Sequence, residues 1–115
     1  MILALSEDFV KVADTKDIQP SRMKEVEVNG EKVCLVNVEG KYYAIGNVCT
    51  HLGGPLAQGK LEGYEVQCPW HGSRFDIRTG KVGRPPAMRS EPTYEIKTEN
   101  DNILLKKRAN QDQSR

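Results

Sequence analysis

Apolar residues in this chain cluster in short strand-like segments of four to seven residues that turn residues interrupt, and no stretch keeps a helical period over ten positions. This pattern predicts an all-β domain. We expect strands over residues 9–12, 25–28, 32–38, 42–45, 64–68, 94–98 and 103–106. Asn29 and Gly30 stand between two of these strands, and both tolerate positive φ, which predicts a two-residue hairpin turn. Antiparallel strands at this spacing favour a sandwich or a small barrel.

Length and charge narrow the possible partners. A chain of 115 residues suits one domain, residues 1–115, with its core over about residues 9–106 and a flexible tail at 107–115. The formal net charge of +1 gives no general attraction to a nucleic acid. No apolar run is long enough for a signal peptide or a membrane span. Three cysteines, an odd number, make no disulfide framework, so we expect a cytoplasmic protein. We expect no membrane partner, and we take a monomer as the default, since the sequence does not define the oligomeric state.

Two long loops interrupt the strand pattern, at residues 46–59 and 69–83. Long loops in small domains usually have a function. Both histidines and two of the three cysteines lie at or next to the start of these loops. They form Cys49-x-His51 and Cys68-x2-His71, and sixteen residues separate the two motifs. This coincidence makes a metal site the leading hypothesis.

The residue types limit which metal such a site holds. Two thiolates and two imidazoles suit a tetrahedral zinc ion or an iron–sulfur cluster, whereas magnesium and calcium prefer oxygen ligands. Zinc fingers commonly place both cysteines in one segment and both histidines in another, but here each segment carries one of each. Composition alone leaves zinc and an iron–sulfur cluster open. For any one of the four residues taken alone, a buried thiol or a surface imidazole remains the plainer interpretation.

At the level of whole motifs, the sequence resembles a known family. The segments CTHLG at 49–53 and CPWHGS at 68–73, with Phe75-Asp76 and Thr79-Gly80 after them, closely resemble the two cluster-binding loops of Rieske-type [2Fe-2S] proteins. The segment 83–87, Gly-Arg-Pro-Pro-Ala, resembles the proline-containing loop that shields the cluster in that family. The resemblance covers roughly residues 9–106.

This resemblance implies both a fold and a cofactor. It implies an antiparallel β-sandwich or small barrels, with a cluster-binding subdomain of two loops and a covering proline loop. It also implies one [2Fe-2S] cluster, with Cys49 and Cys68 on the inner iron and His51 and His71 on the outer iron. These four residues are the predicted metal and cofactor ligands, and no catalytic residue is predicted.

The implied function is that of a soluble one-electron carrier between a reductase and an oxygenase or other terminal enzyme, with no catalysis of its own. A mononuclear iron site for dioxygen chemistry commonly needs two further histidines, and both histidines are already assigned. Two alternatives stay open at this point. The chain could be a small redox subunit of a nitrite-reductase-like complex, or, in a different class, a structural zinc module that binds another protein.

Differences from high-potential members of the family predict a reduction potential in the lower part of the class range, about −150 to 0 mV. Gly54 and Trp70 occupy the positions at which those members carry a disulfide between the two loops. Phe75 replaces a tyrosine whose hydroxyl donates to a cysteine sulfur, whereas Ser73 keeps a hydroxyl that can donate to a bridging sulfide. We expect Trp70 to pack beside the cluster and Cys34 to be a buried core thiol without a ligand role.

The surroundings of the site predict a small docking surface. Leu52, Pro85, Pro86 and Met88 are expected to form an apolar collar around the histidine edges. Basic residues are in excess between positions 68 and 92, where Asp76 and Glu91 are the acidic ones. We expect this excess to steer an acidic redox partner. The five basic residues are Arg74, Arg78, Lys81, Arg84 and Arg89.

Overall fold

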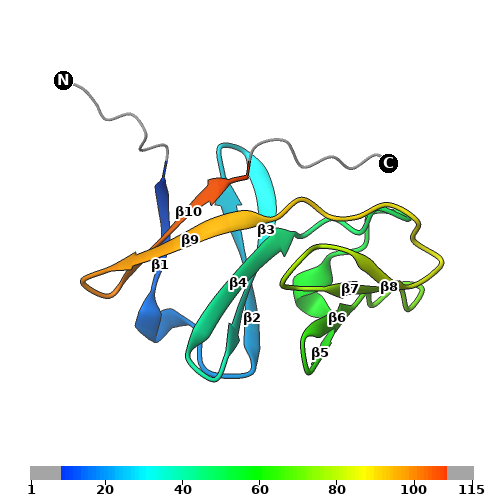
Figure 1. The fold of residues 1–115 in the computed structure, drawn as a ribbon, viewed down its shortest axis with the longest axis horizontal. Coiled ribbons are helices and arrows are strands. Elements are labelled where there is room, and N and C mark those ends of the chain that lie inside the picture. The colour runs from blue at the N-terminus through cyan, green and yellow to red at the C-terminus, as the bar shows by residue number, and fades with distance from the viewer. Residues whose placement is uncertain (1–8, 109–115) are drawn as a thin grey trace.

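The computed structural model describes residues 9–108, and they form ten strands in three antiparallel sheets (Figure 1). The all-β prediction is therefore confirmed. The predicted flexible tail lies outside the described residues from position 109 onward, and Lys107 still pairs with Tyr94 at the end of the last strand. No helix among the described residues has the length and apolar character that crossing a membrane requires.

The three sheets group into two lobes (Figure 1). The sandwich lobe holds a sheet of order β1-β10-β9 and a sheet of order β2-β3-β4; its strands are β1 (Val10–Asp14), β2 (Arg22–Val28), β3 (Glu31–Val38), β4 (Lys41–Gly46), β9 (Tyr94–Glu99) and β10 (Asn102–Lys107). The loop lobe holds a sheet of order β5-β6-β7-β8 and the loops around it; its strands are β5 (Lys60–Glu62), β6 (Glu65–Gln67), β7 (Arg74–Asp76) and β8 (Val82–Arg84). Two short 3-10 turns, η2 (Thr15–Asp17) and η3 (Leu56–Gln58), lie in connecting segments.

Tight turns set the register of the sandwich lobe. Asn29 and Gly30 have φ values of 51° and 88°, so the predicted hairpin turn is confirmed. Val28 pairs directly with Glu31 across it. The same geometry recurs in the turns at residues 39–40 and 100–101, where all four residues have positive φ. Because such turns follow the natural twist of the strands, they favour one pairing over its alternatives.

β3 connects the two hydrophobic cores of the molecule. Val33 and Leu35 on one face pack into the core of the sandwich lobe, and Cys34 and Val36 on the other face pack into the core of the loop lobe. Side chains of a strand alternate between its faces, so a strand covered on both sides reads as an unbroken apolar run. The second core extends from β3 to Phe75 and to both cysteines of the predicted metal site.

The predicted strands differ from the observed ones mainly in the loop lobe. The expected loop at residues 69–83 contains β7 and the start of β8, and β5 was not predicted. Each strand of this sheet has three residues, which is too short for an alternating pattern to stand out. In the sandwich lobe the predicted strands are present with shifted ends; the strand predicted at 25–28, for example, begins at Arg22.

Candidate metal centre

The two Cys-His loops share one backbone design. The first Cys-His loop, residues 49–54, follows β4, and the second, residues 68–73, joins β6 to β7. In the first, the Cys49 N–H donates to the Gly54 carbonyl (2.9 Å), and the Gly53 N–H donates to the Cys49 carbonyl (2.8 Å). In the second, Cys68 makes the same two bonds with the Ser73 carbonyl (2.7 Å) and the Gly72 N–H (3.2 Å).

A glycine with positive φ makes each of these loops possible. Gly53 has φ of 87° and Gly72 has φ of 82°, a region that side chains with a Cβ seldom adopt. Each glycine stands four residues after the cysteine of its loop, so the chain reverses just beyond the histidine. The two loops therefore present one thiol and one imidazole each in corresponding places.

The thiols are on the inner side of the site. Cys49 is 2% exposed and Cys68 is 3% exposed. Burial raises the pKa of the Cys49 thiol, and the adjacent Cys68 thiol raises this pKa as well, whereas backbone hydrogen bonds from His51 and Leu52 lower it. The Trp70 N–H points at the Cys68 sulfur at 3.5 Å. Backbone N–H groups thus surround both sulfurs, an arrangement that stabilises thiolates once a positive metal offsets the burial.

The imidazoles are on the outer side. The ring centroids of His51 and His71 are 5.2 Å apart, and the rings are nearly perpendicular at 82°. His51 is half-buried and His71 is exposed. The structure therefore brings all four predicted residues to the same end of the loop lobe, with sulfur toward the core and nitrogen toward solvent.

This donor set fits a binuclear iron cluster. Within residues 9–108, no three histidine, cysteine, aspartate or glutamate side chains are arranged around a single metal position. A two-iron cluster of the mixed type needs only two protein ligands on each iron, because sulfides supply the others. Two adjacent thiols and two adjacent imidazoles meet that requirement.

The space beside the Cys68 sulfur is too small for a side chain at position 54. A Cβ added to Gly54 would lie 2.6 Å from the Cys68 sulfur and 3.1 Å from the Trp70 ring. Gly54 is therefore required by packing, which the sequence alone did not reveal. Trp70 covers this glycine, but its side chain is 55% exposed, so it is less buried than a residue packed into the core.

The proline loop and the residues just after it are joined to the two Cys-His loops by hydrogen bonds. The Ala87 N–H donates to the Ser73 hydroxyl oxygen (2.9 Å), which leaves the hydroxyl proton of Ser73 for a donation of its own. The Thr50 hydroxyl donates to the Arg89 carbonyl (2.7 Å). Phe75 is completely buried beneath the loops, and Cys34 is a buried core thiol, as predicted.

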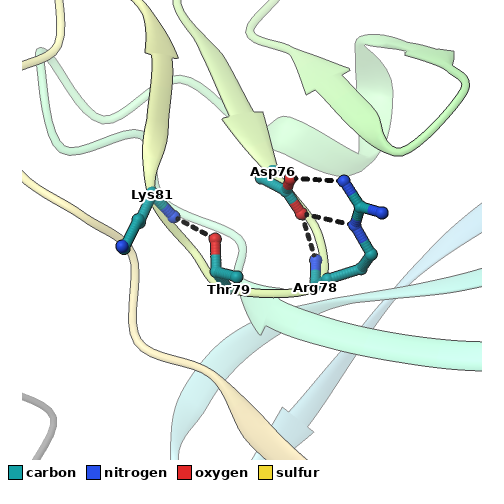
Figure 2. A network of polar contacts seen from close by, with 4 residues as sticks. All are labelled: Asp76, Arg78, Thr79 and Lys81. Atoms are coloured by element: carbon teal, nitrogen blue, oxygen red, sulfur yellow. Dashed lines mark hydrogen bonds and ion pairs between the residues drawn. The ribbon is translucent and has the colours of Figure 1, made fainter.

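Ion pairs offset the charge of two of the five basic residues near the site, Arg74 and Arg78. Asp76 accepts hydrogen bonds from the Arg78 backbone and guanidinium, which lower the pKa of its carboxyl (Figure 2). Arg74 pairs with Glu62 at 2.8 Å and contacts Glu65 at 3.5 Å.

Glu91, the second acidic residue of this segment, is only 4% exposed, and burial raises its pKa to about 8. Within residues 9–108 no ion pair involves Lys81, Arg84 or Arg89, so these three carry the remaining positive charge near the site.

Asn47 is a structural residue that the sequence analysis missed. Its backbone N–H donates to the Lys32 carbonyl (3.0 Å), and its carbonyl accepts the Leu56 N–H (2.8 Å). Its side chain donates to Glu25 (2.8 Å) and accepts the Ala57 N–H (2.7 Å). Asn47 thus fixes both ends of the segment that contains the first Cys-His loop. The only available signal was its position two residues before Cys49.

The fold and the site together define a small two-lobed β protein with a donor set for a binuclear iron cluster. A family model described as the Rieske [2Fe-2S] domain matches residues 8–96. The chain therefore belongs to the Rieske [2Fe-2S] domain family.

Individual relatives agree with this assignment. The chain is 38% identical over 102 residues to the ferredoxin component of naphthalene 1,2-dioxygenase/salicylate 5-hydroxylase systems of a Ralstonia species, covering 89% of this chain and 98% of that one. Among solved structures, it is similar to the ferredoxin of carbazole 1,9a-dioxygenase from Nocardioides aromaticivorans IC177, with 30% identity and a TM-score of 0.81 over 84% of this chain and 95% of that one. It is also similar to a chain in the complex of reduced oxygenase and oxidized ferredoxin of carbazole 1,9a-dioxygenase, with 26% identity and a TM-score of 0.80 over 86% and 93% of the two chains.

Proposed function

We propose that this protein is a soluble one-electron carrier that receives an electron from a reductase and passes it to a Rieske oxygenase. One [2Fe-2S] cluster supplies the redox chemistry. Cys49 and Cys68 hold its inner iron, and His51 and His71 hold its outer iron. The observation that carries the proposal is the pair of matching loops, which place two buried thiols behind two outward imidazoles. An electron can therefore leave through the exposed histidine side.

Charge explains how these ligands affect the reduction potential. Two ferric ions and two sulfides carry two positive charges, which two thiolates cancel when the other ligands are neutral imidazoles. Four thiolates would leave two negative charges and make reduction harder. The class range of about −150 to +300 mV, against about −400 mV for four-cysteine plant-type ferredoxins, reflects this difference. Phe75 offers no donor to a thiolate, so we place this protein in the lower part of the range, about −150 to 0 mV.

The partner would dock at the histidine end. Four apolar side chains there are strongly exposed for their type: Val48 at 50%, Leu52 at 59%, Trp70 at 55% and Met88 at 88%. Contiguous exposed apolar residues mark interaction surfaces, and small ones suit transient electron-transfer complexes. The complementary face of the partner is expected to carry acidic residues opposite the unpaired basic side chains.

A redox titration of the purified protein tests the carrier function. We expect two irons and two acid-labile sulfides per chain, a red-brown colour, and reversible uptake of one electron. A structural zinc module would be colourless and would take up no electron. Zinc in place of iron, or iron without reversible reduction, would contradict the proposal.

Salt dependence tests the charge of the docking surface. Electron exchange with a Rieske oxygenase should slow as ionic strength rises, because salt screens the attraction. Replacing Arg89 by Gln should slow exchange at low salt, whereas Lys24→Gln, on an exposed position of β2, should not. Equal rates for both variants and a flat salt response would remove the steering hypothesis while leaving the carrier function intact.

A further inference from the structure

Glu91 is a buried carboxylic acid for which the proposed electron-transfer function has so far given no role. Its side chain is 4% exposed, and no ion pair within residues 9–108 includes it. One of its carboxyl oxygens, Oε2, has no hydrogen-bond partner there. Burying such a group is costly unless it makes a compensating interaction. Its position in the fold indicates what that interaction is.

The backbone around Glu91 is fixed on both sides. The Glu91 N–H donates to the Gly80 carbonyl at 2.8 Å, and the Gly46 N–H donates to the Pro92 carbonyl at 2.9 Å. Both glycines also leave the space that Glu91 fills: a Cβ on Gly46 would lie 2.5 Å from the Glu91 carboxyl, and a Cβ on Gly80 would collide with the Glu91 carbonyl oxygen. The carboxyl is thus held in one place by its surroundings.

From this place the carboxyl reaches the first Cys-His loop. The backbone N–H of Thr50, the residue between the two donors of that loop, lies close enough to the carboxyl to lower its pKa, an effect smaller than the rise that burial causes. The Thr50 hydroxyl binds the same segment a second time, through the Arg89 carbonyl at 2.7 Å. Thr50 is therefore tied to the segment at residues 89–91 by both its backbone and its side chain.

We propose that Glu91 is a positioning residue: its buried carboxyl fixes the first Cys-His loop through the Thr50 backbone and thereby helps to set the reduction potential. This inference rests on the proposed function, because it presumes a cluster in that loop. Only an acceptor oxygen is needed for positioning, so the neutral acid serves as well as the carboxylate. Ionisation would add a negative charge close to the site and so would oppose reduction.

Within residues 9–108, none of the groups that interact with the Glu91 carboxyl is a cation that could compensate such a charge. Cys34 on β3 and Tyr94 on β9 both feel it, since the Glu91 charge contributes to raising the pKa of each. Neither group is cationic in any protonation state, and the Thr50 side chain is a neutral hydroxyl. The carboxyl is therefore mostly neutral at pH 7, in agreement with its pKa of about 8.

Three variants of the holoprotein test the proposal by iron content and by reduction potential over about pH 6 to 10. Glu91→Gln keeps an acceptor oxygen but cannot ionise, Glu91→Ala loses the acceptor, and Glu27→Gln is a matched control on an exposed position of β2. We expect Glu91→Ala to lose iron or to shift in potential even at the acidic end. We expect Glu91→Gln to match the wild type at the acidic end and to keep a higher potential above pH 8, where the wild type gains a charge. Glu27→Gln should follow the wild type throughout.

The outcomes separate this inference from the proposed function. Glu91→Ala with the iron content and potential of the wild type at the acidic end would overturn the inference alone, whereas parallel curves for the wild type and Glu91→Gln would overturn its charge argument. Loss of iron in Glu91→Gln as large as in Glu91→Ala would also overturn it, because an acceptor oxygen would then not suffice. If Glu91→Ala does not fold, the comparison of the wild type with Glu91→Gln still decides. A wild type without iron would instead contradict the proposed function.

Discussion

The two lobes of this molecule are stabilised in different ways. The sandwich lobe has six strands of five to eight residues, and its hairpins turn through two residues with positive φ. The loop lobe has four strands of three residues each, and its core includes two thiols that we assign to the cluster. Longer paired strands support the first lobe. Because the strands of the second lobe pair over only three residues each, we expect its stability to depend also on what its loops hold.

This difference indicates which part of the molecule a bound cluster would stabilise. Binding to a site that exists only in the folded state stabilises the elements that form the site. Here those elements are the two Cys-His loops and the proline loop, which join one another by few hydrogen bonds. The following predictions test whether the two lobes respond separately, beginning with the largest expected effect.

Removing one inner ligand should affect the loop lobe far more than the sandwich lobe. We expect Cys49→Ser to lose the cluster, and amide hydrogen exchange to become fast in β5–β8 while β2 and β3 stay protected. Cys34→Ala is the matched control, since this third buried cysteine lies on β3. It should keep its iron and lose only about 1 kcal/mol of stability from the smaller side chain. Equal loss of protection in both lobes after Cys49→Ser would contradict the comparison.

Changing an outer ligand should alter the potential without removing its lobe. His71→Cys replaces a neutral imidazole with a thiolate, and the added negative charge makes reduction harder. Where the variant keeps its cluster, we expect the potential to fall by roughly 100 mV or more, toward that of four-cysteine ferredoxins. Protein-film voltammetry measures this shift. A cluster of unchanged potential would mean that His71 is not a ligand.

Burial of Glu91 predicts how stability changes with pH. Its pKa is about 8 in the folded protein, above the ordinary value of 4.5, so the folded state keeps a proton that the unfolded state has lost. The contribution of Glu91 to stability is therefore greatest below pH 4.5 and falls as pH rises toward 8, by on the order of 1 kcal/mol per pH unit relative to a variant without this carboxyl.

Chemical denaturation of the wild type and Glu91→Gln across this window measures the effect. The difference should grow steadily with pH in favour of Glu91→Gln. A constant difference would show that the carboxyl titrates normally, and the account of its burial would then fail.

The smallest predicted effect concerns hydrogen bonding to a thiolate. Phe75 is completely buried in the same core cluster as Cys49 and Cys68. Phe75→Tyr would supply a hydroxyl donor, and one hydrogen bond of about 1 kcal/mol in favour of the reduced state raises a one-electron potential by roughly 40 mV. An unchanged or lowered potential, in a variant with full iron content, would contradict the hydrogen-bond argument.

Sequence patterns predicted these two lobes unequally, for physical reasons. The hairpin at Asn29 and Gly30 could be predicted because its conformation depends on two adjacent residues. The meeting of the four proposed donor residues at one end of the loop lobe could be predicted because both histidines lie in two short motifs. Gly54 and Glu91 could not, because their roles arise from contacts with Cys68 and Thr50 that are distant in the chain. Residues that position a site through tertiary contacts leave little local signal.

The central claim is that sulfur ligands lie on the inner iron and imidazole nitrogens on the outer iron. Electron spin-echo spectroscopy of the reduced protein tests it most directly, because nitrogen nuclei bound to the paramagnetic cluster modulate the echo. We predict strong couplings from two histidine nitrogens in the wild type, and from one nitrogen in a His71→Cys variant that retains its cluster. An iron–sulfur signal without directly bound nitrogen would contradict the account.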